Sequence, residues 1–172
     1  MADIPHALQL DRWIREMARG DRDALARIYE AAGTAVFAYA LSVLKNRSDA
    51  EDVLHDTFVS LWSYAADYKS QGKPMAWIMT IARNHSYKQL QYRQRYQPLE
   101  SDTWLQSFPA DPDDRLMLRQ CMQALTDEER QILVLHAVAG CRFREIGQML
   151  DLNTSTVLSK YHRALKKVRD RF

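Results

Sequence analysis

The sequence predicts an all-α protein made of two small helical domains joined by an extended acidic linker. Apolar residues recur at helical spacing on both sides of residues 98–113, and β-branched alternation is absent. The middle segment holds three of the five prolines and four acidic residues with no basic one. We therefore divide the chain into a first domain at 1–97, a linker at 98–113 and a second domain at 114–172.

Four helices are expected in the first domain. Ser48 and Glu51 have the spacing of a capping box for the third helix, and Pro74 suits the first turn of the fourth. The loop at 67–73 contains Gly72 and two lysines. The four helices are expected at 8–19, 22–45, 49–66 and 74–95.

Four further helices are expected in the second domain. Thr126 and Glu129 form another capping box, and Gly140 ends the helix that follows it. The four helices are expected at 114–124, 127–139, 143–150 and 154–170.

Composition places the chain among ordinary soluble proteins, with 47% apolar and 27% charged residues. No apolar stretch approaches the roughly 18 to 20 residues of a membrane span, and the N-terminus has no signal-peptide core before its charges. We expect a cytoplasmic protein without membrane insertion. The net charge is +2 in the first domain, −4 in the linker and +4 in the second domain, so the C-terminal end is the expected anion contact.

The two cysteines, Cys121 and Cys141, form no C-x-x-C pair, which fits a reducing compartment and predicts no disulfide framework. A metal site made of these two thiols and His136 would lack the close paired spacing of structural zinc sites. There is also no Gly-rich phosphate loop and no triad-like arrangement. We therefore expect no metal, no cofactor and no enzymatic activity.

Residues 143–169 have the layout of a helix-turn-helix. Gly147 would let two helices cross closely, and Asp151 and Asn153 tolerate turn conformations. The residues expected to pack are Ile146, Leu150 and Leu152 against Val157, Tyr161, Leu165 and Val168. The residues expected on the opposite side, where they could enter a major groove, are Thr156, Ser159, Lys160, Arg163 and Lys167. A plain helical hairpin with a solvated face is the alternative.

Two helices of the first domain carry further polar faces. In the third, Val53, Leu54, Phe58, Leu61 and Trp62 form the apolar face, while Asp52, His55, Asp56 and Val59 line another. The fourth is expected to bury Trp77, Ile78 and Ile81 and to present Asn84, Tyr87, Lys88, Gln91 and Arg95. Aromatic and basic residues so interleaved suit single-stranded DNA. From the residues alone, the acidic stripe could also be mere solvent coating, and the fourth helix could be a core helix with a polar back.

Both domains resemble parts of bacterial sigma factors. The second is similar to their promoter-binding domain through Arg130, Glu145, Ile146, Thr156, Val157, Ser159, Arg163 and Ala164. The string SDAEDVLHDTFVSLWSYA resembles the signature of their second region, and Trp77, Ala82 and Asn84 match the helix after it. The chain is identified as a member of the extracytoplasmic-function class of the sigma-70 family. It departs from the family where Gly147 replaces Ala, His55 replaces Gln, Ser155 replaces Gly, Lys160 replaces Arg and Leu158 replaces a residue that is often basic.

The resemblance implies a subunit that binds core RNA polymerase and promoter DNA, under the control of an anti-sigma factor. The clamp coiled coil of the largest polymerase subunit would be bound by Asp52, His55, Asp56 and Val59, and the flap of the second-largest subunit would be a further contact. The minus-10 element would be bound by Lys69, Ser70, Gln71, Gly72, Lys73, Asn84, Tyr87, Lys88, Gln91 and Arg95. The minus-35 element would be bound by Thr154, Ser155, Thr156, Leu158, Ser159, Lys160, Arg163 and Lys167.

Two alternatives stay open at this point. A stand-alone helix-turn-helix regulator would bind DNA tightly without polymerase, whereas a sigma factor of this kind binds promoters well only with it. Leu158 could meet the sugar-phosphate wall or pad the edge of the core. In the family the acidic linker would run through polymerase toward its active centre.

Overall fold

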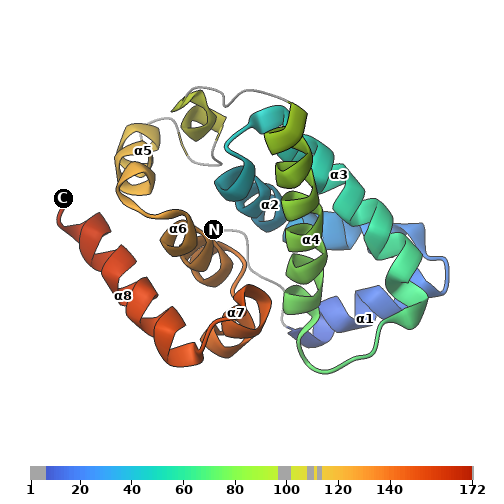
Figure 1. The fold of residues 1–172 in the computed structure, drawn as a ribbon. Helices are drawn as coiled ribbons and strands as arrows, with labels where there is room; N and C mark the ends of the chain where they lie inside the picture. The colour runs from blue at the N-terminus through green and yellow to red at the C-terminus, as the bar shows by residue number, and fades with distance from the viewer. Residues whose placement is uncertain (1–6, 97–101, 108–110, 112–113, 172) are drawn as a thin grey trace.

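The computed structural model describes residues 7–96, 102–107, 111 and 114–171, and it confirms the all-α fold within them. Two groups of helices lie side by side, α1 to α4 in one and α5 to α8 in the other (Figure 1). None of the described helices is long and apolar enough to cross a membrane. The α-helices are α1 (Ala7–Ala18), α2 (Arg22–Leu44), α3 (Arg47–Tyr64), α4 (Pro74–Tyr96), α5 (Arg115–Ala124), α6 (Asp127–Leu133), α7 (Phe143–Leu150) and α8 (Thr154–Arg169).

Helix α2 is the centre of the first group. Asp21 caps it by accepting hydrogen bonds from the backbone N–H groups of Asp23 and Ala24, and Lys45 ends it in the left-handed conformation. Small residues along α2 let α1, α3 and α4 pack closely on it, and each of these helices contributes an apolar stripe. In α1 that stripe is Leu10, Ile14 and Met17, at helical spacing.

The capping box expected from Ser48 and Glu51 is wrong. Helix α3 begins at Arg47, and Asn46 caps it by accepting a 2.9 Å hydrogen bond from the Asp49 N–H. Asn46 has an extended backbone, with φ of −147°, which places its carboxamide over the first turn of the helix. Glu51 pairs instead with Arg47, one turn earlier. At the other end of the loop, Pro74 begins α4 as expected.

The second capping box is confirmed, because Thr126 and Glu129 exchange hydrogen bonds at the start of α6. The sequence predicts one continuous helix at 127–139, whereas the structure changes to a π-helix, η3 (Val134–Val138), in its second half. Val134 and Leu135 of this wider turn are both fully buried against the first group of helices. Gly140, with φ of +71°, ends it.

Within the linker, residues 102–107 form a 3₁₀-helix, η2 (Asp102–Ser107). Its Trp104 and Leu105 are buried, and the Arg130 guanidinium of α6 lies 5.1 Å from the Trp104 ring. Arg130 also donates hydrogen bonds to the Met122 and Leu125 carbonyls at the end of α5. Arg130, which matches the family pattern, therefore ties three elements of the second group together.

The helix-turn-helix of α7 and α8 has a tight turn. Asp151 adopts the left-handed conformation, and a Cβ added to Gly147 would lie only 2.6 Å from the Leu152 carbonyl oxygen. The sequence predicts that Gly147 lets two helices cross closely, whereas in the structure its missing side chain leaves space for the backbone of the turn. The expectation that Leu165 packs is wrong, because 40% of it is exposed and Ala164 is buried instead. Ala164 lies seven residues after the buried Val157, two turns along the same face.

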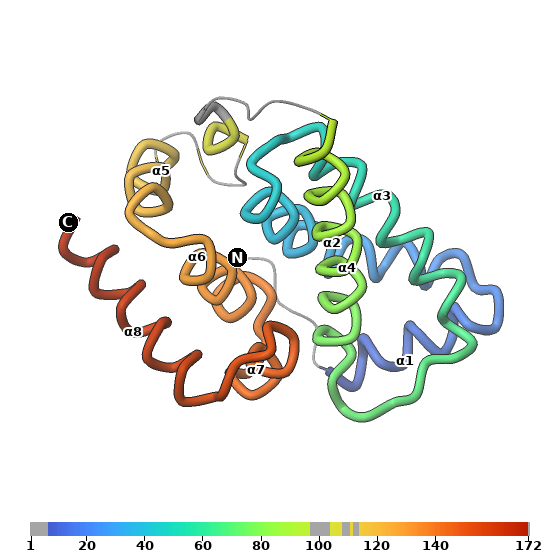
Figure 2. Tube along the Cα trace, viewed as in Figure 1, coloured from blue at the N-terminus to red at the C-terminus, as the bar shows by residue number. Residues whose placement is uncertain are grey.

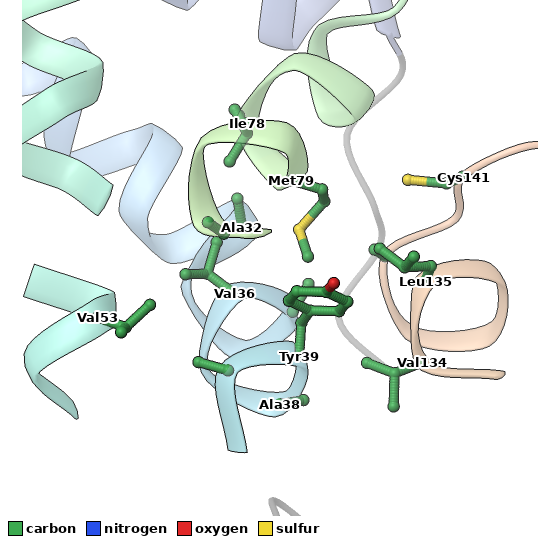
Figure 3. Close-up of a cluster of buried hydrophobic side chains, with 14 of the residues drawn as sticks. Ala32, Val36, Ala38, Tyr39, Val53, Ile78, Met79, Val134, Leu135 and Cys141 are labelled. Carbon is green, nitrogen blue, oxygen red and sulfur yellow. The ribbon is translucent and has the colours of Figure 1, made fainter. Parts of the chain in front are cut away.

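The two groups of helices pack on each other in one connected apolar cluster. Helix α2 contacts α6 and η3, and α4 contacts α7 (Figure 2). Tyr39 of α2 lies between Met79 of α4 and Val134 and Leu135 of η3 (Figure 3). Its buried hydroxyl donates a 3.0 Å hydrogen bond to the Gln131 carboxamide of α6. At the rim, Lys45 and Asp127 form a 2.9 Å ion pair.

We predict that Gly147→Ala lowers the free energy of unfolding by about 1–3 kcal/mol, because the new methyl group forces the turn's backbone to move. Thermal and urea denaturation followed by circular dichroism would measure it. Gly33→Ala in α2 is the matched control, since its Cβ would meet the Tyr29 ring at an ordinary 3.6 Å. Equal stability of the two variants would show that the turn shifts without cost.

Candidate functional site

Helix α3 presents an acidic face to solvent. Asp52, His55, Asp56 and Val59 are all exposed, and their spacing places them on one side of the helix. The apolar face on the other side is as expected for Val53, Phe58 and Leu61, which are buried. The structure therefore brings together the four residues that the sequence singled out on this helix.

An apolar groove adjoins this acidic face. The expectation that Trp62 is buried is wrong, because 38% of it is exposed, and Tyr29 and Val59 are about half exposed. Together with Leu25 and Phe58 they line a groove of about 630 Å³ between α2 and α3, and His55 lies at its edge. The first group of helices has no further helix to cover this side of α2 and α3 among the described residues.

The loop before α4 is exposed along its length, at Lys69, Ser70, Gln71, Gly72 and Lys73. Gly72 has φ of +70°, a conformation that few other residues adopt. The residue before the loop, Tyr68, packs against Trp77 of α4 with ring centroids 4.6 Å apart and ring planes tilted by 52°. The loop is thus an open segment that begins at a packed aromatic pair.

Most of the polar face expected on α4 is confirmed as exposed, namely Asn84, Lys88, Gln91 and Arg95. Tyr87 differs, because it is half-buried and its hydroxyl exchanges hydrogen bonds of 3.2–3.3 Å with the Gln131 carboxamide. On the inner face Ile78 is buried, whereas Trp77 and Ile81 are only half-buried, contrary to expectation. Both still pack against the connected apolar cluster.

A cavity of about 560 Å³ lies where the loop and α4 meet α7. On one side it is lined by Lys69, Gln71, Lys73, Trp77 and Arg83, and on the other by Glu145, Gln148 and Met149. The Arg83 guanidinium stacks 4.7 Å from the Tyr87 ring. The aromatic and basic side chains of the first domain therefore face the second domain across this cavity.

The second helix of the helix-turn-helix, α8, exposes Thr154, Ser155, Ser159 and Arg163, while Thr156 and Leu158 are half-buried. Leu158 is not part of the connected apolar cluster of the described residues. Residues of the turn, with Arg144 and Gln148, line a shallow depression of about 350 Å³ beside the start of α8.

Lys160 and Lys167 do not lie opposite the packed face of α8. Lys160 pairs with Glu128 at 2.5 Å and Lys167 with Glu129 at 2.7 Å, both in the first turn of α6. Lys160 lies four residues before the fully buried Ala164 and Lys167 three residues after it, so helical spacing places both lysines beside the packed face of α8.

Two family descriptions match the two parts of the chain that carry these surfaces. The family description "Sigma-70 region 2" matches residues 28–96, which include the acidic face of α3, the loop and α4. The description "Sigma-70, region 4" matches residues 115–168, which include the helix-turn-helix. A relative from Mycobacterium ulcerans, "ECF RNA polymerase sigma factor SigK", is 30% identical over 94% of this chain and 92% of its own length.

The chain belongs to the extracytoplasmic-function class of the sigma-70 family.

Other relatives of this sigma factor have the same span. The protein of the same name from Mycobacterium bovis is 27% identical over 94% of this chain and 92% of its own. Two solved structures share the fold. CnrH in complex with the cytosolic domain of CnrY has a TM-score of 0.68 and 21% identity, and the match covers 94% of this chain and 96% of that chain. RpoE in complex with the anti-sigma factor NepR from Bartonella quintana has a TM-score of 0.66 and 20% identity, and the match covers 85% of this chain and 94% of that chain.

Sequence reasoning missed Gln131 and the groove at Trp62. Gln131 is only 5% exposed, so its carboxamide needs buried hydrogen-bond partners, and its place directly before an apolar run is the one signal that the sequence offers. Trp62 lies at a position that the helical period assigns to either face, so its exposure depends on which helices cover α3. The described residues hold no group of three or more His, Cys, Asp or Glu that could bind a metal.

The ion pair of Glu129 with Lys167 makes the stability of this sigma factor depend on pH. Burial alone would raise its pKa, but hydrogen bonds from Lys167 and Thr126, with the charge of Lys167, outweigh burial and lower the pKa. A carboxylate with a lowered pKa stabilises the fold fully above its ordinary value of 4.5, and this stabilisation is lost as the pH falls through its folded pKa.

We predict that Glu129→Gln lowers the free energy of unfolding at pH 7 by about 1–3 kcal/mol, because Lys167 loses a charged partner. The difference from wild type should shrink as the pH falls below about 4.5. Urea denaturation at several pH values measures both. Glu128→Gln, at a neighbouring exposed carboxylate, is the control and should change little. A difference that stays constant with pH would contradict this role of Glu129.

Proposed function

We propose that this protein docks on core RNA polymerase in the cytoplasm and directs it to promoters by binding their minus-35 and minus-10 elements. The observation that carries the proposal is the presence of three separate exposed surfaces in the two matched regions. They are the acidic face of α3, the loop with the polar face of α4, and the start of α8.

Core polymerase would bind the acidic face of α3, through Asp52, His55, Asp56 and Val59. The neighbouring groove, with Trp62 and Tyr29, is continuous with this face and extends it. Exposed apolar side chains beside charged ones form the usual anatomy of a protein interface, in which aromatic anchors contribute most of the binding energy. We assign the groove and the face together to the clamp coiled coil of the largest polymerase subunit, and the second domain to the flap of the second-largest.

Melted minus-10 DNA would bind the loop and α4. The loop contributes Lys69 to Lys73, and α4 contributes Asn84, Tyr87, Lys88, Gln91 and Arg95. Bases stack on aromatic rings while basic side chains follow the phosphates.

Duplex minus-35 DNA would bind α8, and its exposed Thr154, Ser155, Ser159 and Arg163 support this assignment. Leu158 would lie at the edge of the DNA, since it is half-buried outside the apolar cluster. Lys160 and Lys167 would first have to leave Glu128 and Glu129. Their contribution to DNA affinity is therefore reduced by the strength of those ion pairs.

The packing of the two domains bears on how this binding begins. Tyr87 is held by Gln131, and α7 lies across the cavity from the loop. A minus-10 strand could reach all of these residues only after α6 and α7 leave α2 and α4. We propose that residues 1–97 and 114–172 separate as units about the linker at 98–113 when the protein joins polymerase, and that the free protein binds minus-10 DNA poorly.

An anti-sigma factor is the further partner that we propose. One of the two similar solved structures is of the sigma factor RpoE in complex with the anti-sigma factor NepR, and the other is of CnrH in complex with the cytosolic domain of CnrY. A partner that holds the two domains in the packed arrangement would keep the proposed minus-10 surface from DNA.

Transcription from a library of promoter sequences, with core polymerase and this protein alone, tests the proposed function. We expect specific initiation that requires both proteins, and only weak binding of promoter DNA by the free protein. A stand-alone helix-turn-helix regulator would give the opposite result, namely tight duplex binding without polymerase and no initiation with it.

We predict that replacing Asp52 and Asp56 together by Lys abolishes binding to core polymerase, because the acidic face becomes basic, while helix content stays unchanged. Co-purification with core and circular dichroism measure the two properties. Glu51→Lys, on the same helix but facing Arg47, is the control. Wild-type co-purification of the double variant would remove this face from the polymerase interface.

A pair of variants on the second domain should change minus-35 affinity in opposite directions. Arg163→Ala should weaken binding of holoenzyme and lower the slope of log affinity against log salt by about one unit, since one phosphate contact is lost. Glu128→Gln should strengthen binding, because it releases Lys160 from its carboxylate partner. Fluorescence anisotropy with a minus-35 duplex at several salt concentrations measures both. An unchanged slope for Arg163→Ala would place that residue away from the DNA.

A further inference from the structure

Helix α1 lies ahead of the residues that match region 2, yet one of its side chains reaches the loop of the proposed minus-10 surface. Asp11 is an acidic residue within the buried stripe of α1 and is only 3% exposed. Its Oδ1 accepts a 2.7 Å hydrogen bond from the hydroxyl of Tyr68, 57 residues later in the chain. Asp11 therefore connects α1 to the residue that immediately precedes the loop at 69–73.

The carboxylate is held in place on both oxygens. Oδ2 lies 2.6 Å from the Arg15 guanidinium one turn later in α1, while Oδ1 faces Tyr68. Burial alone would raise the pKa of Asp11, but the side chains of Ser70 and Tyr68 and the charge of Arg15 outweigh burial and lower the pKa. The group is therefore charged at neutral pH, and a hydrogen bond to a charged acceptor is among the stronger ones in proteins.

Tyr68 also contacts α4, so it connects Asp11 of α1 to that helix. Its ring packs against Trp77, and its backbone N–H donates to the Ala65 carbonyl in the 3₁₀-turn η1 (Ala65–Asp67). At the far end of the loop, the Lys73 carbonyl accepts a hydrogen bond from the Trp77 N–H, and Pro74 is buried. The loop is thus fixed at both ends and exposed between them.

We propose that Asp11 is a positioning residue for the loop at 69–73, and that the contact from Asp11 to Tyr68 sets the geometry with which this loop receives an unpaired base of the minus-10 element. This inference rests on the proposed function. A loop with a glycine in a left-handed conformation and no buried side chain of its own between its ends keeps its shape only through its attachments. Because Asp11 lies in the buried stripe of α1, it attaches the start of the loop to a helix other than α4.

The test uses the full-length protein in holoenzyme with two variants, Tyr68→Phe and Asp11→Asn. Tyr68→Phe removes the hydroxyl and keeps the ring on Trp77, and Asp11→Asn removes the charge at nearly constant shape. The probe is a single-stranded minus-10 oligonucleotide, taken from a promoter that the library experiment selects, in a matched form and in a form without the base that the loop receives. We expect each variant to lower the ratio of matched to abasic affinity about three- to tenfold.

The two variants should also be non-additive, because Tyr68→Phe removes the donor of the contact that Asp11→Asn weakens by leaving a neutral acceptor. The double variant should therefore lower the ratio no further than the more severe single variant. Arg12→Ala is the matched control, since Arg12 forms an exposed ion pair with Glu16 on the same helix and does not reach the loop. Affinity for core polymerase should not change in any of these variants.

A purely structural role predicts a different pattern. If Asp11 only holds α1 in place, the variants would lower thermal stability and leave the matched-to-abasic ratio at its wild-type value, which would overturn the inference. Failure of the proposed function would appear separately, as the absence of specific initiation and of oligonucleotide binding by wild-type holoenzyme.

Discussion

The burial of α2 is the constraint on which the rest of the structure depends. Thirteen of its 23 residues are buried, so it needs neighbours on nearly every side. Helices α1, α3 and α4 cover part of its surface, and α6 with η3 covers another part. Tyr39 is the polar group in this contact, and its hydroxyl needs Gln131 as a partner because an unsatisfied buried hydroxyl costs about 1–3 kcal/mol. The packing of the second domain on the first follows from this requirement.

Within the part of the chain that the structure describes, the first turn of α6 forms three ion pairs with other elements. Acidic residues are favourable there because the N-terminus of a helix has partial positive charge. Asp127 pairs with Lys45 of the first domain, while Glu128 and Glu129 pair with Lys160 and Lys167 of α8. Hydrogen bonds and charges from Lys45 and Arg130 outweigh burial and lower the pKa of Asp127 as well. The same short acidic segment thus contributes to domain packing and, under the proposed function, would compete with promoter DNA for the two lysines.

Comparison of individual residues shows why parts of the site could be predicted. The acidic face of α3 and the exposed residues of α4 follow from helical spacing, which is a local property. Trp62, Tyr87 and Lys160 were placed wrongly or incompletely, because each contacts or fails to contact an element far away in the chain. The cap of α3 was misplaced for a local reason, since Asn46 and Ser48 are both good capping residues and only the backbone conformation selects one.

The sequence by itself determined the helical fold, the positions of its turns and the family. These depend on periodicity, on caps, on Gly140 and Pro74, and on motifs that lie within short segments. Only the tertiary structure decided how the two halves pack, which lysines of α8 are already paired, and that Asp11 reaches Tyr68. Such contacts join residues dozens of positions apart, and a sequence period records which face of a helix is buried without recording what buries it.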